Sequence, residues 1–239
     1  MRATIRRPMG SPRLDAFLRA LTARHRVLLL GGLAVIAHGL SRATKDADVW
    51  LDPLDSSVDW AAAVQDVASQ FPETALATLP GWRRLASLTE LAAAADEIGM
   101  VRVLGLECPL DIFRRPNELD EAAFDEVWGR STMKEDGVRL PEPLDVLQSK
   151  LETGRDSDCA DLAFLESKVR GSFGDRLATA TLEEARHLFA RYTDHVVARR
   201  ALANPNPAVQ LLAREILEEL AAQGDPFSRD LLATVLPPD

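Results

Sequence analysis

The chain has 239 residues, enough for one large domain or two small ones with a substantial core. Apolar residues make up 46% of it and charged residues 27%, as in an ordinary soluble globular protein. The net charge of −9 argues against a dominant non-specific hold on nucleic acid, although a local basic groove is compatible with it. The apolar stretch over residues 28–36 is too short and too rich in glycine to cross a membrane, and we expect no signal peptide.

The first part of the chain alternates helices with short apolar strands. Leu14, Phe17 and Leu21 recur at helical spacing, and a later apolar run ends at a glycine pair. In chain order, we expect a helix over 12–24, a strand over 26–30, a helix over 31–40, a strand over 46–51 and a helix that includes 61–68.

The middle of the chain has one weak stretch and several clearer signals. Residues 74–94 show little apart from a turn at Pro80 and Gly81. After them we expect strands over 100–106 and 109–113, a helix over 119–128, and a hairpin centred on Asp136 and Gly137.

From residue 143 onward every predicted element is helical. Leu144, Leu147 and Leu151 form the expected inner stripe of the first of these helices. The sequence therefore predicts an α+β protein. Its mixed α/β domain covers residues 1–140, and a helical domain covers residues 141–239.

The two strands that flank the glycine pair carry the strongest chemical signal. Asp46 and Asp48 are two residues apart in a predicted strand, so both side chains lie on the same side. Two such carboxylates repel one another unless a cation lies between them, and oxygen ligands beside phosphates suit Mg²⁺. Gly31 and Gly32 permit the close backbone approach that a phosphate site requires. This pattern predicts metal-assisted chemistry on a nucleotide.

The segment from Gly31 to Asp48 resembles the nucleotidyltransferase superfamily that includes DNA polymerase beta. The signature of that superfamily is a strand ending in Gly-Gly or Gly-Ser, a helix, and a strand carrying Asp-x-Asp. The Arg-x-Thr-x-Asp-x-Asp run over 42–48 is most similar to the AbiEii-type branch, known for toxins of toxin–antitoxin pairs, and to related uncharacterised bacterial families. The resemblance covers residues 26–165 and implies a mixed-sheet nucleotidyltransferase core. Gly32 stands where many members have a phosphate-binding serine.

The resemblance also implies residues further along the chain. A third carboxylate is expected on a neighbouring strand, and Asp111 lies among apolar residues where an unpaired acid is costly to bury. Lys150 would bind the nucleotide phosphates. In the Arg-x-x-Asp-x-x-Asp-Leu run that begins at Arg155, Asp161 would orient Lys150 or Arg155, or face the acceptor.

The candidate site is therefore defined by three overlapping groups, with Mg²⁺ or Mn²⁺ as cofactor. The catalytic residues are Asp46, Asp48, Asp111 and Lys150. The metal ligands are Asp46, Asp48 and Asp111. The nucleotide-binding residues are Gly31, Gly32, Arg42, Thr44, Lys150, Arg155 and Asp161.

Each assignment has a purely structural alternative. Asp46 and Asp48 could be solvated acids at the start of a strand, and Asp111 could be a charge on an edge strand. Arg42 could act only as the counter-ion of Asp46, and Lys150 could be a surface lysine. Asp161 could be an acid in the first turn of a helix. For Asp158 we prefer a helix cap, for His38 a core histidine, and for Cys108 and Cys159 inert reduced thiols in a cytoplasmic protein.

The resemblance implies transfer of a nucleoside monophosphate from a nucleoside triphosphate to transfer RNA, a protein or a small molecule. An RNA acceptor requires a basic path, for which Arg186, Arg191, Arg199 and Arg200 are candidates. The alternative from another class is an inactive nucleotidyltransferase-like protein that binds a cognate toxin or antitoxin. Its candidate surface contains Glu183, Glu184, Glu218 and Glu219. A small-molecule-modifying resistance enzyme is the third alternative.

Overall fold

The computed structural model describes residues 12–117, 119–134, 137–151 and 158–235. They fall into two compact units, one ending at Leu165 and the other beginning at Glu166. We call these the sheet unit and the helical unit. The division falls within helix α7 (Cys159–Leu177), so the first turns of α7 group with the sheet unit.

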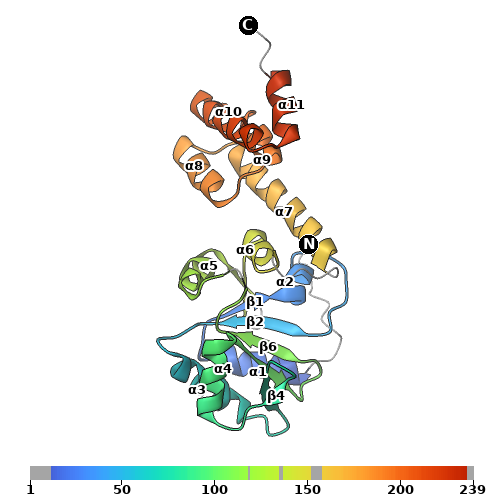
Figure 1. Ribbon diagram of the computed structural model, residues 1–239, viewed down its shortest axis with the longest axis vertical. Helices are drawn as coiled ribbons and strands as arrows, with labels where there is room; N and C mark the ends of the chain where they lie inside the picture. The colour runs from blue at the N-terminus through green and yellow to red at the C-terminus, as the bar shows by residue number, and fades with distance from the viewer. Residues whose placement is uncertain (1–11, 118, 135–136, 152–157, 236–239) are drawn as a thin grey trace. The chain divides into compact units, whose positions relative to one another are not determined.

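The sheet unit is built on one mixed sheet of eight strands in the order β4-β3-β5-β6-β2-β1-β8-β7 (Figure 1). The β2–β6 and β1–β8 pairs are parallel and the others are antiparallel. The strands are β1 (Val27–Leu30), β2 (Ala47–Leu51), β3 (Ala75–Thr78), β4 (Arg83–Arg84), β5 (Met100–Leu104), β6 (Leu110–Phe113), β7 (Thr132–Met133) and β8 (Arg139–Leu140). This α+β architecture with a mixed sheet confirms the predicted fold class.

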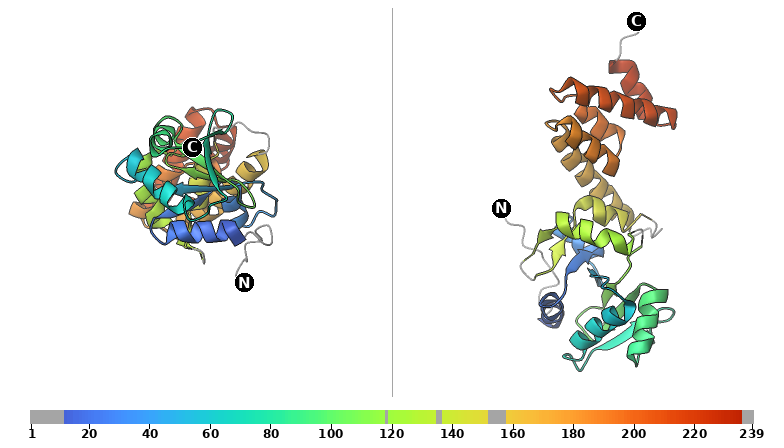
Figure 2. Two further views of the ribbon diagram at one scale, coloured as in Figure 1. Left: turned by 90° about the horizontal axis from the view of Figure 1, so that it is seen from below. Right: turned by 90° about the vertical axis from the view of Figure 1, so that its left-hand side faces the viewer.

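Helices cover both faces of this sheet. On one face lie α1 (Pro12–Thr22), α3 (Ser57–Ala68) and α4 (Leu88–Glu97), with α3 and α4 side by side in the right-hand view of Figure 2. On the other face lie α2 (Gly31–Ala37), α5 (Phe124–Arg130) behind a short 3₁₀ turn η1 (Glu121–Ala123), and α6 (Pro143–Gln148) (Figure 1). Ser56 and Ser87 cap α3 and α4, each accepting a hydrogen bond from the backbone N–H of the third residue of its helix.

The face beneath α5 is organised in two rows of side chains that run across the strands. Residues opposite one another in a ladder point to the same face, and so do residues two apart in one strand. The apolar row contains Leu28, Trp50, Phe113 and Met100. Two residues further along each strand, the charged row contains Leu30, Asp48, Asp111 and Arg102. The same alternation therefore produces a core at one end of this face and a charged cluster at the other.

The helical unit holds the rest of α7 together with α8 (Leu182–Arg191), α9 (His195–Ala201), α10 (Pro207–Ala222) and α11 (Pro226–Val235). Thr181 and Glu184 form a reciprocal capping box at the start of α8. Asn204, which is buried, donates to the carbonyls of Leu177 and Ala180 at 2.7 and 2.9 Å and thereby ties the α9–α10 turn to the end of α7. None of the helices described combines the length and the apolar character needed to cross a membrane.

Two local differences from the sequence analysis have simple causes. Leu151 is 55% exposed because α6 ends at Gln148, so the helical stripe does not extend to it. The weak stretch over 74–94 contains β3, β4 and the start of α4, which are short and partly exposed. The predicted hairpin is present as the antiparallel β7–β8 pair, although residues 135–136 at its turn lie outside the described residues.

Candidate functional site

The charged row brings two of the predicted acids together at one end of the strands. Asp48 is the second residue of β2 and Asp111 the second residue of β6, and they are direct neighbours in the parallel ladder. Asp46 lies just before β2 rather than within it. These three acids therefore meet where β1 ends and where β2 and β6 begin.

Asp111 is held by an arginine that the sequence analysis did not single out. Arg102, opposite Asp111 in the antiparallel β5–β6 pair, donates from Nε and Nη2 to the two Asp111 oxygens, each at 2.6 Å. The side chains are 17% and 8% exposed, so this two-pronged ion pair is largely shielded from water. The hydrogen bond to Asp111 is the main cause of a raised pKa for Arg102. The sequence signal for this role was that Arg102 is the one charged residue in the otherwise apolar strand β5.

Trp82 contacts the Arg102 guanidinium, and the sequence analysis did not single it out either. The Arg102 Cζ atom lies 3.6 Å from the centre of the Trp82 ring, a close cation–π contact. Trp82 adopts a left-handed backbone conformation, with φ of 56°, in the turn between β3 and β4. That turn was predicted from Pro80 and Gly81, but nothing in the sequence indicated that the tryptophan reaches the carboxylates.

Asp48 has the most perturbed acidity in the site. Its pKa is raised to about 7, chiefly by burial and then by the neighbouring charges of Asp46 and Asp111, while Lys150 and Arg102 act in the opposite direction. The Asp48 carboxyl group is therefore harder to ionise than an ordinary aspartic acid, because it is buried beside two other acids.

Asp46 is the most accessible of the three acids, with its side chain 40% exposed. Its Oδ2 atom lies 3.9 Å from Arg102 Nη2. The Thr44 hydroxyl lies 3.1 Å from the Asp46 carbonyl oxygen and 3.3 Å from its Oδ1 atom. Thr44 therefore fixes the approach of the chain to β2 and restrains the Asp46 carboxylate.

The glycine pair has a specific steric role at this site. Gly31 has a φ of 55°, and a Cβ atom there would overlap with the Asp48 carboxylate. A Cβ atom on Gly32 would lie 2.7 Å from both Arg42 Nη2 and Thr44 Oγ1. The glycines thus make room for three of the predicted site side chains. Their proposed role in binding phosphate through backbone amides stays a prediction.

A second group of charges lies beside the first. Lys150, just beyond α6, lies 3.1 Å from the carboxylates of both Asp158 and Asp161, and all three residues are buried. Arg42 Nη2 donates to Asp161 Oδ2 at 2.6 Å. Asp161 thus orients both Arg42 and Lys150, and Asp158 pairs with Lys150. Arg155 lies outside the described residues.

Two buried polar atoms of this second group make no hydrogen bond. Within the described part of the chain, Asp161 Oδ1 and Arg42 Nε are buried without a hydrogen-bond partner. Such atoms carry a desolvation penalty that an additional polar group relieves. The Asp161–Arg42 pair can therefore accept a further polar group.

The oxygen atoms of the three acids are the candidate ligands of a metal ion. Over residues 12–117, 119–134, 137–151 and 158–235, no three or more His, Cys, Asp or Glu side chains stand as a ready-made metal site. Asp46 and Asp48 offer the oxygen donors that Mg²⁺ and Mn²⁺ prefer. Asp111 offers the same donors, and each of its oxygens accepts one hydrogen bond from Arg102. A carboxylate oxygen that accepts one hydrogen bond retains a second lone pair, so the donor set fits such an ion.

Other polar residues singled out in the sequence lie in different settings. His38 Nε2 lies 3.0 Å from the carbonyl oxygen of Pro141, which satisfies a ring nitrogen at the edge of α2. Cys108 is partly buried and Cys159 is exposed, and both are free thiols. Burial raises the pKa of Cys108, so its thiol is less ionised than an ordinary cysteine.

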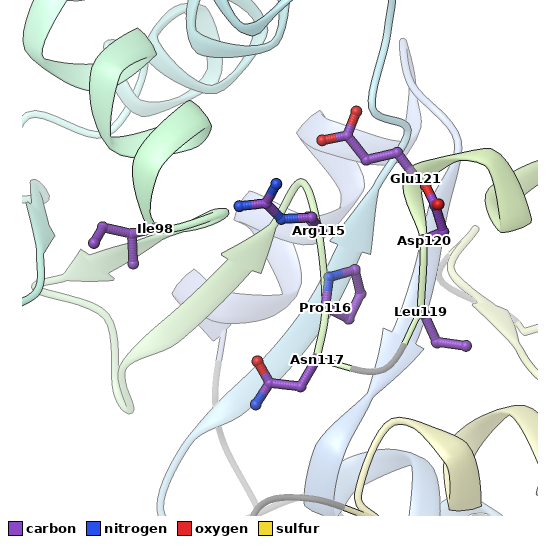
Figure 3. Close-up of a pocket in the computed structure, with 7 residues that line it drawn as sticks. All are labelled: Ile98, Arg115, Pro116, Asn117, Leu119, Asp120 and Glu121. Atoms are coloured by element: carbon purple, nitrogen blue, oxygen red, sulfur yellow. The ribbon is translucent and has the colours of Figure 1, made fainter.

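A hollow of the sheet unit lies at the opposite end of the strands from the acids. It measures about 680 Å³ and is lined by Ile98 before β5 and by residues 115–117 and 119–121 after β6 (Figure 3). Because β6 begins at the charged row and ends at the apolar row, this hollow and the acids are separated by the length of the strand. It is not part of the candidate site.

No protein-family model matches the chain, and no curated protein matches it in sequence.

Proposed function

We propose that this chain is a metal-dependent nucleotidyltransferase, with a nucleotidyltransferase core in its sheet unit. It would move a nucleoside monophosphate from a nucleoside triphosphate to an acceptor. The observation that carries the proposal is the meeting of Asp46, Asp48 and Asp111 at one end of the sheet, beside the glycine pair. A buried acid whose pKa is raised beside other acids, as that of Asp48 is, is a common feature of sites that bind cations or transfer protons.

The donor set supports Mg²⁺ or Mn²⁺ as the cofactor. Asp46 and Asp48 would hold the ion, with Asp111, the ladder neighbour of Asp48, as the third ligand. When bound, the metal would neutralise charge on the reacting phosphate and on the leaving group.

The remaining residues would bind and orient the triphosphate. Lys150 acts electrostatically on Asp48 and would neutralise phosphate charge at the same edge. Arg42, with a buried and unpaired Nε, would donate to a phosphate oxygen while Asp161 holds its other end. The backbone amides of Gly31 and Gly32 would add further donors.

The reaction itself balances without a further reactant. An acceptor oxygen forms a bond to the α-phosphorus, the bond from that phosphorus to the bridging oxygen breaks, and pyrophosphate leaves. The acceptor proton passes to a carboxylate of the cluster, for which Asp111 is the candidate base. The acceptor is RNA, a protein hydroxyl or a small molecule.

Calorimetry tests the binding half of this proposal. We expect wild-type protein to bind one of the four nucleoside triphosphates in the presence of Mg²⁺, and the Asp46→Ala/Asp48→Ala variant to lose that binding. Asp55→Ala is the matched control, because Asp55 is exposed in the loop after β2. No binding by the wild type, or equal binding by wild type and double variant, would contradict the proposal.

Label transfer tests the chemical half. Protein incubated with α-labelled triphosphates and total cell RNA or lysate should transfer label to an acceptor, and the double variant should not. Filter binding at two salt concentrations separates the acceptors, because affinity for RNA falls as salt rises.

One observation favours a second candidate function. Arg102 fully engages Asp111, as expected of a structural ion pair in a protein with no need for a third metal ligand. The chain would then be an inactive nucleotidyltransferase-like protein that binds a cognate toxin or antitoxin. Two results would favour this function: no acceptor is labelled in the transfer assay, and the Asp46→Ala/Asp48→Ala variant binds the partner as tightly as the wild type does.

A further inference from the structure

The line of the charged row continues across the sheet beyond the acids. The ladder registers place Ala77 of β3 opposite Arg102 of β5, and Arg84 of β4 opposite Ala77. Residues that face one another in this way point to the same side of the sheet, so Arg84 shares the face of Arg102 and Asp111. Arg84 is exposed, and β4 is the edge strand. From β2 to β4 the line therefore passes from acidic side chains to basic ones.

Trp82 lies in the turn that joins β3 to β4, beside the basic end of this line. Its ring packs on the Arg102 guanidinium, with 3.6 Å between the Arg102 Cζ atom and the ring centre. Arg102 is itself fixed by two hydrogen bonds of 2.6 Å to Asp111, so the ring has a rigid support. The tryptophan is only partly buried. Part of a large, well-supported aromatic surface is therefore open to solvent close to the acids.

The backbone of this turn points to a role for the ring beyond closing a hairpin. Gly81 and Trp82 are both left-handed, with φ angles of 71° and 56°. Glycine, asparagine and aspartate are the usual residues at such positions, and a bulky side chain there costs free energy. Residues held in this conformation against that cost gather at functional sites. The position of the ring, rather than the needs of the turn, accounts for a tryptophan here.

The order of the strands places Trp82 on one particular side of the proposed site. The glycine pair follows β1, Asp111 lies in β6, and Trp82 contacts β5 through Arg102. The glycine pair, which would bind the triphosphate, and Trp82 therefore lie on opposite sides of Asp111. Asp111 is the candidate base for the acceptor proton. A group that reaches Trp82 from the acids therefore belongs to the acceptor.

We propose that Trp82 is a stacking platform for a nucleobase of the acceptor, and that the acceptor is a nucleic-acid strand. This inference rests on the proposed function and names the acceptor class that the function leaves open. A base of any sequence stacks on an aromatic ring, and a nearby cation binds the adjoining phosphate. Arg84 is that cation. The pairing of ring and exposed cation matches a base and its phosphate together, which a protein hydroxyl does not provide.

The net charge of −9 determines the form of this binding. An acidic chain gains little from general attraction to phosphates, so stacking should supply most of the affinity. One phosphate contact to a single strand lowers the logarithm of the affinity by about 0.7 for each tenfold rise in salt. We therefore expect RNA binding with a shallow salt dependence, to which Arg84 contributes about one such contact.

The anisotropy of a dye-labelled, short single-stranded RNA measures the affinity of the full chain. Trp82→Leu should weaken RNA binding by roughly tenfold, as loss of one stacked base does, and Trp82→Phe should weaken it less because a ring remains. Trp128→Leu is the matched control. Trp128 is also partly buried and packs on an arginine, Arg139, at 4.7 Å, but it lies in α5. Equal RNA affinities of Trp82→Leu and the wild type would overturn the inference.

The two arginines of β4 test which face of the sheet the strand follows. Arg84→Gln should weaken RNA binding by roughly threefold and flatten its salt dependence. Arg83→Gln is the matched control, because Arg83 points to the other face and lies 3.0 Å from Glu90 of α4. Its RNA affinity should match that of the wild type. Equal losses in the two variants would overturn the assignment of this face to the acceptor.

Triphosphate separates the acceptor base from the donor base. Non-hydrolysable triphosphate analogues should bind Trp82→Leu and the wild type equally tightly in the presence of Mg²⁺. In the label-transfer assay, Trp82→Leu should raise the KM for RNA and leave the KM for triphosphate unchanged. Weaker binding of the analogue, with unchanged binding of RNA, would assign the ring to the donor nucleotide and overturn the inference.

Tryptophan fluorescence keeps the test decisive if Trp82→Leu does not fold. RNA should quench the emission of the wild type, whereas Trp82→Phe should bind RNA without this quenching. Trp50 and Trp60 are fully buried and out of reach of a base. Equal quenching in Trp82→Phe would overturn the inference.

The two proposals fail in different ways. A wild type that binds triphosphate but no RNA would overturn the acceptor assignment and leave the proposed function intact. A wild type that binds no triphosphate would overturn the proposed function, and the acceptor assignment with it.

Discussion

The two rows on the α5 face of the sheet differ in chemistry although they share strands and alternation. In the apolar row, Leu28 and Trp50 are fully buried and pack with Phe124 of α5. In the charged row, Asp48 and Asp111 take the equivalent places two residues away and are balanced only in part by Arg102. Uncompensated charge in a partly buried row opposes folding, whereas buried apolar surface favours it. The comparison indicates that the apolar row stabilises the sheet, whereas the charged row opposes folding, as is expected if it forms the proposed metal site.

The largest effect should follow from damage to the apolar row. Phe124 is 1% exposed and meets Trp50 edge to face, with ring centres 5.1 Å apart. Phe124→Ala should lower the free energy of unfolding by about 3–5 kcal/mol, as for other buried aromatic truncations. Urea denaturation measures this loss. Mn²⁺ affinity per folded molecule should stay unchanged, and a parallel loss would show that the two rows are not independent.

Gly31→Ala should have the next largest effect because Gly31 lies directly under the charged row. The added methyl group would overlap with the Asp48 carboxylate and would also occupy a left-handed conformation. We expect a loss of roughly 2–4 kcal/mol in unfolding free energy, the sum of both effects. Gly81→Ala is the matched control, since Gly81 has a φ of 71° with no atom near the new Cβ, and it should lose only about 1 kcal/mol. If Gly31→Ala and Gly81→Ala lost the same unfolding free energy, the Asp48 side chain would be able to move away from the new methyl group at no cost.

The charged row should also produce an unusual pH dependence. The folded-state pKa of Asp48 is about 7, above the value of about 4 expected in the unfolded chain. The folded state therefore binds this proton more tightly, and the row destabilises the protein increasingly as the pH rises from 4 to 7. In EDTA at pH 8, Asp48→Asn should raise the unfolding free energy by roughly 1–3 kcal/mol, since each unit of pKa difference is worth about 1.4 kcal/mol.

Two controls sharpen that prediction. The gain from Asp48→Asn should shrink as the pH falls towards 4, whereas exposed Asp55→Asn should give a flat profile. Mg²⁺ should stabilise the wild type at pH 8 and should fail to stabilise Asp48→Asn. A variant that is less stable than the wild type at pH 8 would show that Arg102 and Lys150 already neutralise Asp48.

The sequence indicated the acids of the charged row but not the residues that surround them. Alternation and the glycine pair singled out Asp46 and Asp48, and the resemblance implied a third acid, Asp111, on a neighbouring strand. Arg102 escaped notice because its role depends on the β5–β6 register, which no local pattern specifies. Trp82 escaped because it lies in the weak stretch over 74–94, where short strands carry little periodic signal.

The glycine pair and the first C-terminal helix illustrate two further limits. Glycine pairs indicate close approach, but the sequence cannot say what approaches, and here it is the side chains of Asp48, Arg42 and Thr44. Helical spacing included Leu151 in an inner stripe, but the helix ends at Gln148. Periodicity continues through a helix end that lacks a glycine or proline signal, so such ends are predicted poorly.

The smallest effect comes from removing one polar contact near each row. Trp50 Nε1 donates to the carbonyl of Arg114 at 3.0 Å, and the Thr44 hydroxyl contacts Asp46. Thr44→Val should lower the unfolding free energy by about 1 kcal/mol, the usual net value of one hydrogen bond, and Trp50→Phe should lower it somewhat more, because it also leaves a cavity in the core. Only Thr44→Val should also weaken Mn²⁺ binding, because Thr44 restrains the Asp46 carboxylate. Urea denaturation and Mn²⁺ titration of both variants separate stability from ligand binding. Equal Mn²⁺ affinities would mean that Asp46 needs no such restraint in the proposed metal site.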